Sequence, residues 1–271
     1  MVMFTVGMCT YDDYDGVYFT VQSLQLYHPL VTEIIIVDNN PLSKHSELCK
    51  QLAETSHKIK YYTYDKKTST TVKGEIFKYA SNDIVVVCDC HILFPLKSFE
   101  ALKDFYDNHH KPFDLVQGPL LLDNLKNENN CLKPGWGSYF YGIWDNIKIS
   151  KSYDEIQAQG MGVFSCKKNE WLGFNKLFKG FGGEEYYIHD KYRKKGGRCI
   201  CVKNFKWLHR FGRPHGIPFE NTYEDRFNNY VAGKIELGEK YDEIIDAFKE
   251  VISKERMQEI IDYIKLFFLI K

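Results

Sequence analysis

The feature that most constrains the fold is an alternation of short apolar strands with helical patterns over the first ninety residues. Runs of β-branched and other apolar residues predict strands at residues 4–9, 33–38, 59–64 and 84–89. Helical patterns between them predict helices at residues 16–27, 43–56 and 72–80. Strands of this kind that alternate with helices form a largely parallel sheet with helices on both faces. We therefore predict an α/β fold with a mixed, mostly parallel central sheet.

The second half of the chain has a less regular pattern. It predicts strands at residues 113–122, 160–166 and 199–202, a short helix that begins at 170–172, and a helix at 184–195. Residues 123–130 are polar and predict a loop, and residues 134–138 predict a mobile loop that carries Trp136. Beyond Gly238 the pattern is helical. We expect one domain over residues 1–235 and a C-terminal helical extension over residues 236–271.

Charge and cysteine usage narrow the class of protein. The 36 basic and 36 acidic residues balance, whereas a nucleic-acid-binding protein would normally show a basic excess. The eight cysteines are scattered through apolar stretches and predict no disulfide framework, which fits a reducing, cytoplasmic setting. No secretory leader is recognisable, and no run of 18 apolar residues predicts a membrane-spanning helix.

The extension is amphipathic. We expect it to pack on the domain or to pair with another copy of the chain in a homodimer. The apolar cluster at residues 266–270 offers an alternative, which is peripheral contact with a membrane surface.

Polar side chains follow three of the predicted strands. Thr10 and Asp12 follow the first, Asp38 ends the second, and Asp89 with His91 ends the fourth. In sheets of this type, ligands bind outside the carboxyl ends of the strands. Acids repeated at one edge of the sheet therefore predict a shared polar site.

The segment Asp89-Cys90-His91 is a candidate metal site. In an extended segment Asp89 and His91 point to the same side. A carboxylate and an imidazole suit Mn²⁺ and related divalent ions. Alone, the segment is explained equally well by an acid at a strand end beside a hydrogen-bonded histidine.

Two later segments carry further candidates. Glu184 and Glu185 follow two glycines, which let the backbone approach a ligand closely. One of these acids could be a general base, although both would also suit the start of a helix. His209 could complete a metal site and Arg210 could meet a phosphate, but a lone histidine is more often structural.

In their order and spacing, these segments resemble the GT-A glycosyltransferases of family 2. Residues 6–15 and 38–40 resemble the nucleotide-binding half of that family, and residues 84–91 resemble the strand that ends in its Asp-x-Asp motif. His91 at the last position is a variant also seen in polypeptide N-acetylgalactosaminyltransferases. The acceptor strand and the Gly-Gly-Glu segment of those enzymes resemble residues 160–164, 171–174 and 182–185. The resemblance covers about residues 4–215.

The resemblance implies a role for each matching residue. Mn²⁺ or Mg²⁺ would be held by Asp89, His91 and His209. Glu184 would bind sugar hydroxyls, and Glu185 would be the base if the reaction inverts the anomeric centre. The nucleotide would be bound by Thr10, Tyr11, Asp12, Asp38, Lys73 and Arg210, with Arg213 as a further phosphate-binding candidate. Trp136 would stack on the acceptor or close over the donor, unless it only packs within its loop.

The implied enzyme moves a sugar from a nucleotide-diphosphate sugar to a hydroxyl of a glycan or protein. UDP is the favoured nucleotide, with GDP as an alternative. Position 185 carries Glu where Asp is commoner, and position 91 carries His, so the sequence leaves inversion and retention both open. The donor sugar and the acceptor are left open as well.

Three other interpretations compete with this one. The residues Cys88, Cys90, Cys199 and Cys201 form two Cys-x-Cys pairs, but structural zinc sites favour Cys-x₂₋₄-Cys. A nucleotidyltransferase acting on sugar phosphates would normally carry a glycine-rich, basic loop near the N-terminus, where residues 9–16 are acidic instead. A non-catalytic sugar-binding module would not need so complete a set of metal ligands and carboxylates.

Overall fold

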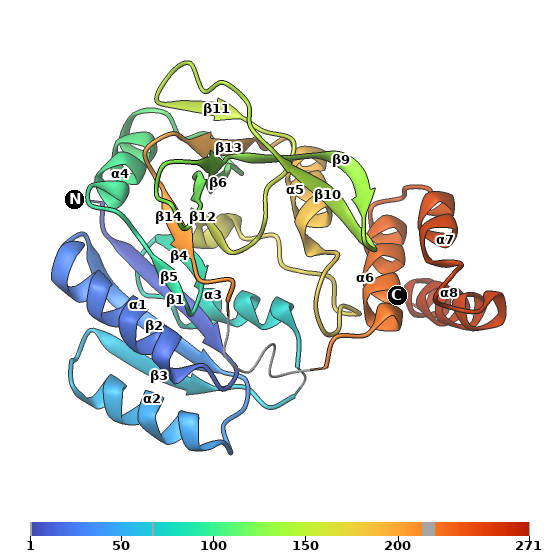
Figure 1. Ribbon diagram of the computed structural model, residues 1–271, viewed down its shortest axis with the longest axis horizontal. Helices are drawn as coiled ribbons and strands as arrows, with labels where there is room; N and C mark the ends of the chain where they lie inside the picture. The colour runs from blue at the N-terminus through green and yellow to red at the C-terminus, as the bar shows by residue number, and fades with distance from the viewer. Residues whose placement is uncertain (1, 67, 213–219, 271) are drawn as a thin grey trace.

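The computed structural model describes residues 2–66, 68–212 and 220–270, and its centre is an eight-stranded sheet (Figure 1). The strand order is β11-β13-β6-β12-β4-β1-β2-β3. Six strands run in one direction: β1 (Phe4–Thr10), β2 (Val31–Asp38), β3 (Ile59–Thr63), β4 (Ile84–Asp89), β6 (Leu115–Gln117) and β13 (Cys199–Val202). Two run against them: β11 (Tyr153–Glu155) and β12 (Val163–Lys167). The predicted mixed, mostly parallel sheet is confirmed.

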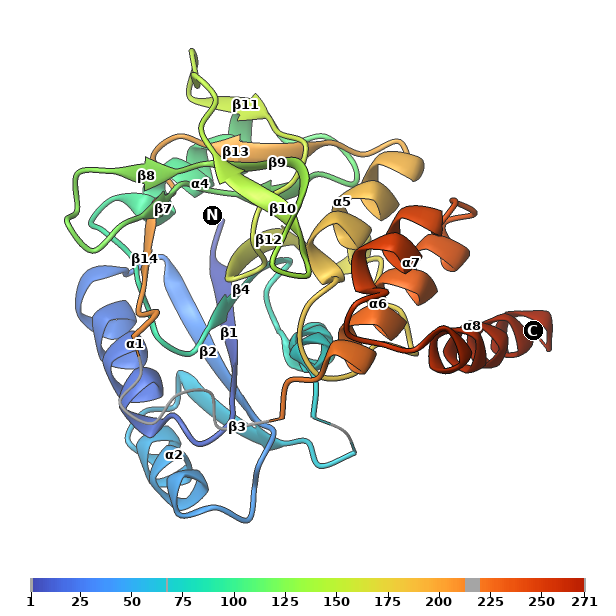
Figure 2. The same cartoon turned by 45° about the vertical axis from the view of Figure 1, so that its right-hand side comes forward.

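Helices cover both faces of this sheet, because its apolar strands bury side chains on both sides. In β4, Val85 and Val87 enter one core, while Val86 and Cys88 enter the other. One core is closed by α1 (Tyr14–Tyr27), α2 (Lys44–Glu54) and α4 (Ser98–Asn108). The opposite core is closed by a 3₁₀ helix (Thr70–Glu75), α3 (Ile76–Tyr79), α5 (Glu184–Lys194) and α6 (Tyr223–Glu236). Figure 2 shows the two groups of helices on either side of the sheet.

The C-terminal part packs on α6. It consists of α7 (Asp242–Phe248) and α8 (Lys254–Leu269), and its helical character is as predicted. Phe248 and Ile264 are fully buried in the same core as the sheet. The end of α8 nevertheless leaves Leu269 and Ile270 largely exposed. Among the described residues, no helix combines the length and apolarity needed to cross a membrane.

Two smaller sheets lie beside the main one. The hairpin of β9 (Cys131–Gly137) and β10 (Phe140–Asp145) forms the first. The second has the order β5-β14-β7-β8, with β5 (Ile92–Leu93), β14 (Trp207–His209), β7 (Leu120–Leu121) and β8 (Glu128–Asn129). In this sheet β14 pairs with β5 so that His209 lies opposite Ile92. This pairing carries His209 across to the end of β4.

The irregular second half contains four local corrections to the sequence predictions. The predicted strand 113–122 is broken between β6 and β7, where a Cβ on Gly118 would lie 1.6 Å from the Phe205 carbonyl oxygen. Residues 134–137 belong to β9 and not to a loop, and the polar segment 123–130 ends in β8. The predicted helix at 170–172 is a 3₁₀ turn at Lys168–Glu170, after which Trp171 is extended and stacks on Phe77 with ring centroids 4.4 Å apart. All eight cysteines are free, as predicted.

Candidate active site

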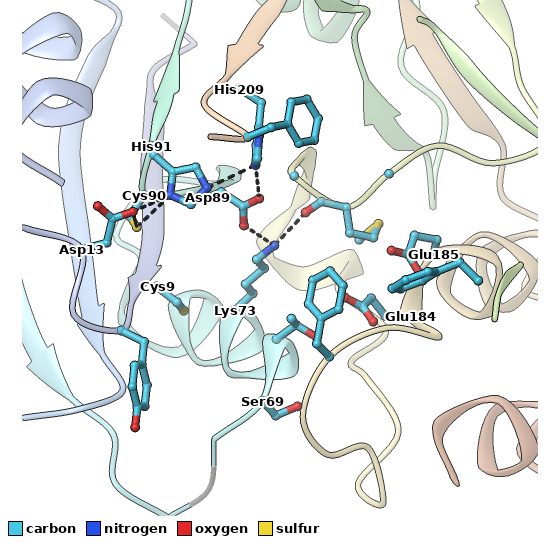
Figure 3. Close-up of a pocket in the computed structure, with 18 of the residues that line it drawn as sticks. Cys9, Asp13, Ser69, Lys73, Asp89, Cys90, His91, Glu184, Glu185 and His209 are labelled. Carbon is cyan, nitrogen blue, oxygen red and sulfur yellow. Dashed lines mark hydrogen bonds and ion pairs between the residues drawn. The ribbon is translucent and has the colours of Figure 1, made fainter. Parts of the chain in front are cut away.

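A cavity of about 680 Å³ opens at the carboxyl ends of β1 and β4. One wall is formed by these strand ends and β14, and the other by the start of α5 (Figure 3). Eight of the predicted site residues line it: Thr10, Tyr11, Lys73, Asp89, His91, Glu184, Glu185 and His209. The two walls differ in chemistry, so they are described in turn.

The first wall brings together the three predicted metal ligands. His91 Nε2 lies 3.2 Å from His209 Nε2, and His209 Nε2 lies 3.3 Å from Asp89 Oδ2. Burial alone would raise the pKa of the Asp89 carboxyl, but Lys73 and His209 outweigh it and hold this pKa well below its usual range. An ionised carboxylate therefore faces two imidazole nitrogens.

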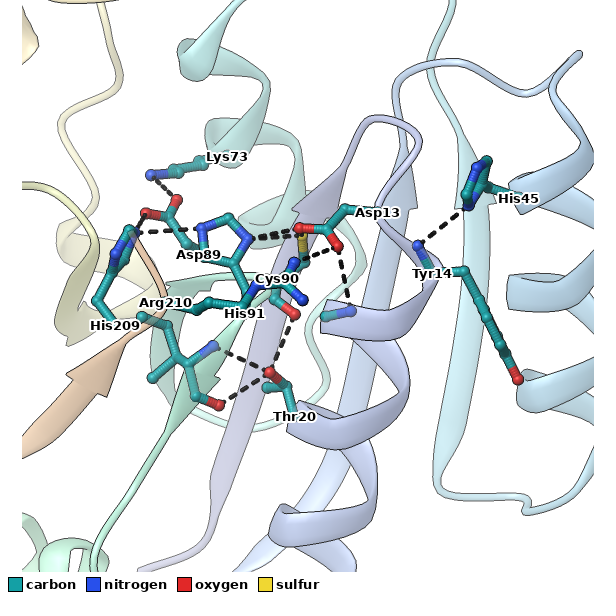
Figure 4. A network of polar contacts seen from close by, with 12 residues as sticks. Asp13, Tyr14, Thr20, His45, Lys73, Asp89, Cys90, His91, His209 and Arg210 are labelled. Carbon is teal, nitrogen blue, oxygen red and sulfur yellow. Dashed lines mark hydrogen bonds and ion pairs between the residues drawn. The ribbon is translucent and has the colours of Figure 1, made fainter. Parts of the chain in front are cut away.

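Asp13 orients His91 through the ring nitrogen that does not face His209. Its Oδ2 lies 2.8 Å from His91 Nδ1, and its Oδ1 accepts a hydrogen bond of 2.6 Å from Arg210 (Figure 4). When Nδ1 carries the proton, the Nε2 lone pair of His91 is directed at the cavity. Burial would raise the pKa of Asp13, but the hydrogen bonds from His91 and Arg210 lower it well below its usual range. The sequence prediction chose the neighbouring Asp12, since no local signal separates the two acids.

Lys73 is a buried cation that connects this wall to the segment just before β12. Its Nζ lies 2.7 Å from Asp89 Oδ1 and donates a hydrogen bond of 2.9 Å to the Met161 carbonyl oxygen. Burial would lower the pKa of the Lys73 ammonium, but the Asp89 charge raises it above its ordinary value. Lys73 therefore stays protonated and occupies the Asp89 oxygen that does not face the histidines.

The second wall presents two acids at the start of α5. Gly182 and Gly183 both have φ of +95°, a left-handed conformation that favours glycine, and they turn the chain into the helix. Glu184 is buried, and no well-formed hydrogen bond reaches its Oε2 among the described residues, although the Thr70 hydroxyl lies close enough to lower its pKa. Burial and then the charge of Glu184 raise the pKa of Glu185 to about 8, and burial also raises the pKa of Glu184. These carboxyls hold protons more tightly than ordinary acids do.

Other predicted site residues lie outside the cavity wall. Asp38 is buried, and its carboxylate accepts hydrogen bonds from Ser46 Oγ and from Tyr61 Oη, the latter at 2.9 Å. Asp12, with φ of +54°, accepts from Asn40 at 3.0 Å. The Arg210 guanidinium pairs with Asp13, and the Arg210 backbone N–H donates to the His91 carbonyl oxygen at 3.2 Å. Arg213 lies outside the described residues.

Sequence reasoning also missed the aromatic rim of the cavity. Trp136 packs inside the molecule against Tyr141 and Tyr230, with ring centroids 5.2 Å and 5.1 Å away. The tryptophan of the hairpin that lines the cavity is Trp144. Further aromatic residues that line it include Phe140, Tyr141, Phe181, Trp207 and Phe211. Contact with a distant helix separates the two tryptophans, because Trp136 packs against Tyr230 of α6 while Trp144 lines the cavity.

The zinc interpretation is not supported by the arrangement of the cysteines. Strand β4, with Cys88 and Cys90 at its end, is separated from the Cys199–Val202 strand by β12 and β6. In the described part of the chain, two groups of side chains could hold a metal ion, and both contain His91. One is Asp89, His91 and His209, and the other is Asp13, Cys90 and His91. Neither joins the two cysteine pairs.

Comparison with protein families decides the class of protein. Residues 5–155, which are more than half of the chain, match the model of the family described as glycosyl transferase family 2. The chain belongs to glycosyl transferase family 2. It is therefore a glycosyltransferase, as the resemblance implied. A search among curated proteins found no match.

Solved structures of glycosyltransferases share the fold of this family 2 protein and confirm the predicted GT-A architecture. GalNAc-T7 with UDP, GalNAc and Mn²⁺ superposes with a TM-score of 0.69 at 12% identity, covering 97% of this chain and 57% of that one. S. aureus TarS with UDP-GlcNAc superposes with a TM-score of 0.57 at 12% identity, covering 96% of this chain and 70% of that one. The mannosyltransferase PcManGT from Pyrobaculum calidifontis with GDP-Man and Mn²⁺ superposes with a TM-score of 0.53 at 12% identity, covering 97% of this chain and 73% of that one. At this identity the likeness shows the fold alone.

Proposed function

We propose that this glycosyltransferase transfers a sugar from a nucleoside diphosphate sugar to a hydroxyl acceptor, with a divalent cation held by Asp89, His91 and His209. The convergence of these three side chains on one point is the observation that carries the proposal. Adjacent ligands of an octahedral cation with bonds of about 2.1 Å lie about 3 Å apart. The separations of 3.3 Å between Asp89 Oδ2 and His209 Nε2 and 3.2 Å between the two histidine Nε2 atoms are close to that spacing.

The nature of the ligands favours Mn²⁺, with Mg²⁺ as the alternative. Imidazole and carboxylate together suit transition-metal ions, whereas Mg²⁺ prefers oxygen ligands alone. The pKa of Asp89 lies below its usual range, so the carboxylate is ionised at neutral pH. When bound, the cation would stabilise the negative charge on the departing nucleoside diphosphate. Lys73, 2.7 Å from Asp89, adds a fixed positive charge beside this position.

Glu185 is the proposed base and Glu184 the proposed binder of sugar hydroxyls. The raised pKa of Glu185, about 8, makes it a stronger base than an ordinary carboxylate. If the reaction inverts the anomeric centre, Glu185 accepts the proton of the attacking hydroxyl. The Oε2 of buried Glu184, which no well-formed hydrogen bond satisfies among the described residues, would accept one from a sugar hydroxyl.

UDP is the preferred nucleotide of the donor, and GDP the second candidate. Two of the similar structures contain UDP or a UDP-sugar, and one contains GDP-Man. Thr10 and Tyr11 line the cavity near the end of β1, where they would contact the nucleoside. The proposed acceptor is a glycan or protein hydroxyl. Because this chain spans 57% of the GalNAc-T7 chain, the acceptor of that enzyme is not carried over.

The test is donor hydrolysis combined with thermal shift. Purified protein is incubated with UDP-glucose, UDP-GlcNAc, UDP-GalNAc or GDP-mannose, each with Mn²⁺, Mg²⁺ or EDTA. We expect at least one donor to raise Tm and to be hydrolysed only when the cation is present, since ligands that bind only the folded state stabilise it.

The matched control is Asp145→Asn, because Asp145 is half-exposed on the hairpin and pairs with Lys133 away from the metal wall. This variant should keep the metal-dependent Tm shift, and Asp89→Asn should lose it. A folded protein that neither binds nor hydrolyses any of the four donors with either cation would contradict the proposal.

A further inference from the structure

His189 is a fully buried polar side chain one helical turn beyond Glu185 on α5. Its Nδ1 lies 2.5 Å from the Glu185 carbonyl oxygen, and its Nε2 lies 2.6 Å from Gln117 Oε1. Both ring nitrogens are therefore engaged, and neither faces the cavity. A buried imidazole at this position has a cost in desolvation that only its partners offset.

Gln117 carries this connection to the segment before β12. It is fully buried on β6, and its Nε2 donates hydrogen bonds to the carbonyl oxygens of Gly160, at 2.8 Å, and Val163, at 3.1 Å. The Gln159 backbone N also lies 3.3 Å from His189 Nε2. The His189 imidazole and the Gln117 amide thus contact residues 159–163 on the side away from Lys73 and Asp89.

The front of the same segment contacts the first wall of the cavity. The Met161 carbonyl oxygen accepts from Lys73, and the Gly162 carbonyl oxygen accepts from the Asp89 backbone N–H at 2.8 Å. Gly160 lies under Trp144, since a Cβ on Gly160 would be 2.8 Å from that ring. The segment therefore has the Lys73–Asp89 pair on one side and His189 with Gln117 on the other.

We propose that His189 and Gln117 are positioning residues that fix the distance between the two walls of the active site. They join the backbone of Glu185, on α5, to the segment that holds Lys73 and Asp89. This inference rests on the proposed function, in which Glu185 acts on a donor bound at the first wall. A displacement of about 1 Å in a reacting group can cost about 10²-fold in rate. The metal ligands have their own anchors on β4 and β14, so donor binding depends less on this connection.

The test uses the full chain and four variants: His189→Leu, Gln117→Leu, the double variant and His189→Gln. For each Leu variant we expect kcat of donor turnover to fall about 10–100-fold, with the donor KM within about twofold. The double variant should be no slower than either single variant, because both substitutions break the same contact between His189 and Gln117. His189→Gln keeps a polar group toward Gln117 and should recover most of kcat.

His28→Leu is the matched control for a loss of stability alone. His28 is equally buried, and its Nε2 lies 3.0 Å from the Phe94 carbonyl oxygen. It follows the end of α1 opposite to Asp13, and it does not line the cavity. The variant should lower Tm about as much as His189→Leu while leaving kcat unchanged. A fall in kcat in His28→Leu that matches the fall in His189→Leu would overturn the proposal, and so would a wild-type kcat in His189→Leu.

Hydrogen exchange separates this inference from the proposed function. Backbone amides of residues 159–163 should exchange faster in His189→Leu and Gln117→Leu, but not in His28→Leu. Unchanged exchange in this segment would refute the positioning role whether or not a donor is known. Faster exchange in a protein that turns over no nucleotide sugar would support the connection and refute the proposed function.

Discussion

The two walls of the cavity both carry largely buried carboxyl groups, but their pKa values are shifted in opposite directions. Asp13 and Asp89, on the first wall, have lowered pKa values, and Glu184 and Glu185, on the second, have raised ones. Desolvation raises the pKa on both walls, so the difference lies in the partners. Lys73, Arg210 and two histidines contact the acids of the first wall, as Figure 4 shows, whereas the second wall has two adjacent acids.

This contrast separates two chemical tasks. Carboxylates held ionised beside imidazoles can bind a cation and, through it, a diphosphate. Carboxyls with raised pKa values bind protons near neutral pH, as a general base must. The fold achieves the separation with different elements, since the first wall comes from strand ends and the second from a helix that starts after two glycines.

Removal of Asp89 should have the largest effect. We expect Asp89→Asn to reduce metal-dependent donor turnover by at least about 10³-fold, because the cation loses a ligand and Lys73 loses its partner. The measurement is nucleotide release with Mn²⁺, at a temperature where circular dichroism shows the variant to be folded. Turnover within tenfold of the wild type would mean that the first wall does not hold the catalytic cation.

Glu185→Gln should come next, with a loss of about 10²–10³-fold in kcat of transfer. In the wild type, log kcat should rise with pH and level off near the Glu185 pKa of about 8, since only the ionised form accepts a proton. The variant should lack this rise. The pH profile between pH 6 and 9 is the measurement, and identical profiles in the two proteins would remove Glu185 from the role of base.

Asp13→Asn tests how the first wall is organised. Asp13 binds no cavity ligand in the proposal but directs His91 through Nδ1. Groups that orient a metal-binding histidine typically contribute 10–100-fold to metal affinity. We expect the Kd of Mn²⁺ to rise by about that factor, as measured by calorimetry, while kcat at saturating Mn²⁺ stays within about fivefold. A large loss of kcat with unchanged Mn²⁺ affinity would instead place Asp13 in contact with the substrate.

The regular half of the fold could be predicted from sequence because its signals are local. Apolar runs mark β1, β2, β3 and β4, and Ser43 caps α2 as predicted, accepting a hydrogen bond from the Ser46 backbone N–H. The spacing in Asp89-Cys90-His91 likewise made the metal-site prediction possible. What local signals omit is set by pairing between distant segments. The register of β14 on β5 carries His209 to His91, and the packing of Trp136 on Tyr230 of α6 leaves Trp144 to line the cavity.

The choice between Asp12 and Asp13 shows the same limit at the scale of one residue. Both acids follow β1, and alternation alone cannot say which turns inward, because Asp12 adopts a left-handed conformation that ends the extended segment. Its side chain then meets Asn40, and the next residue reaches His91.

The smallest expected effect is on stability, and it should have opposite pH dependence for the two walls. The pKa of Glu185 is raised from 4.5 in the unfolded chain to about 8, so between these values the folded state binds more protons and stability falls as pH rises. Asp13 has a lowered pKa, so its contribution is present at neutral pH and is lost only on acidification below about pH 4. Glu185→Gln should therefore have the Tm of the wild type near pH 5 and exceed it by at least about 2 °C at pH 9.

Asp13→Asn should show the reverse, with a Tm deficit at pH 7 that shrinks toward pH 3. Glu155→Gln, an exposed substitution on β11, is the control and should change Tm equally little at every pH. A Tm difference for Glu185→Gln that does not vary between pH 5 and 9 would show that this acid titrates normally in the folded protein. The contrast between the walls would then lie in their geometry alone, and the base at the second wall would need another source of activation.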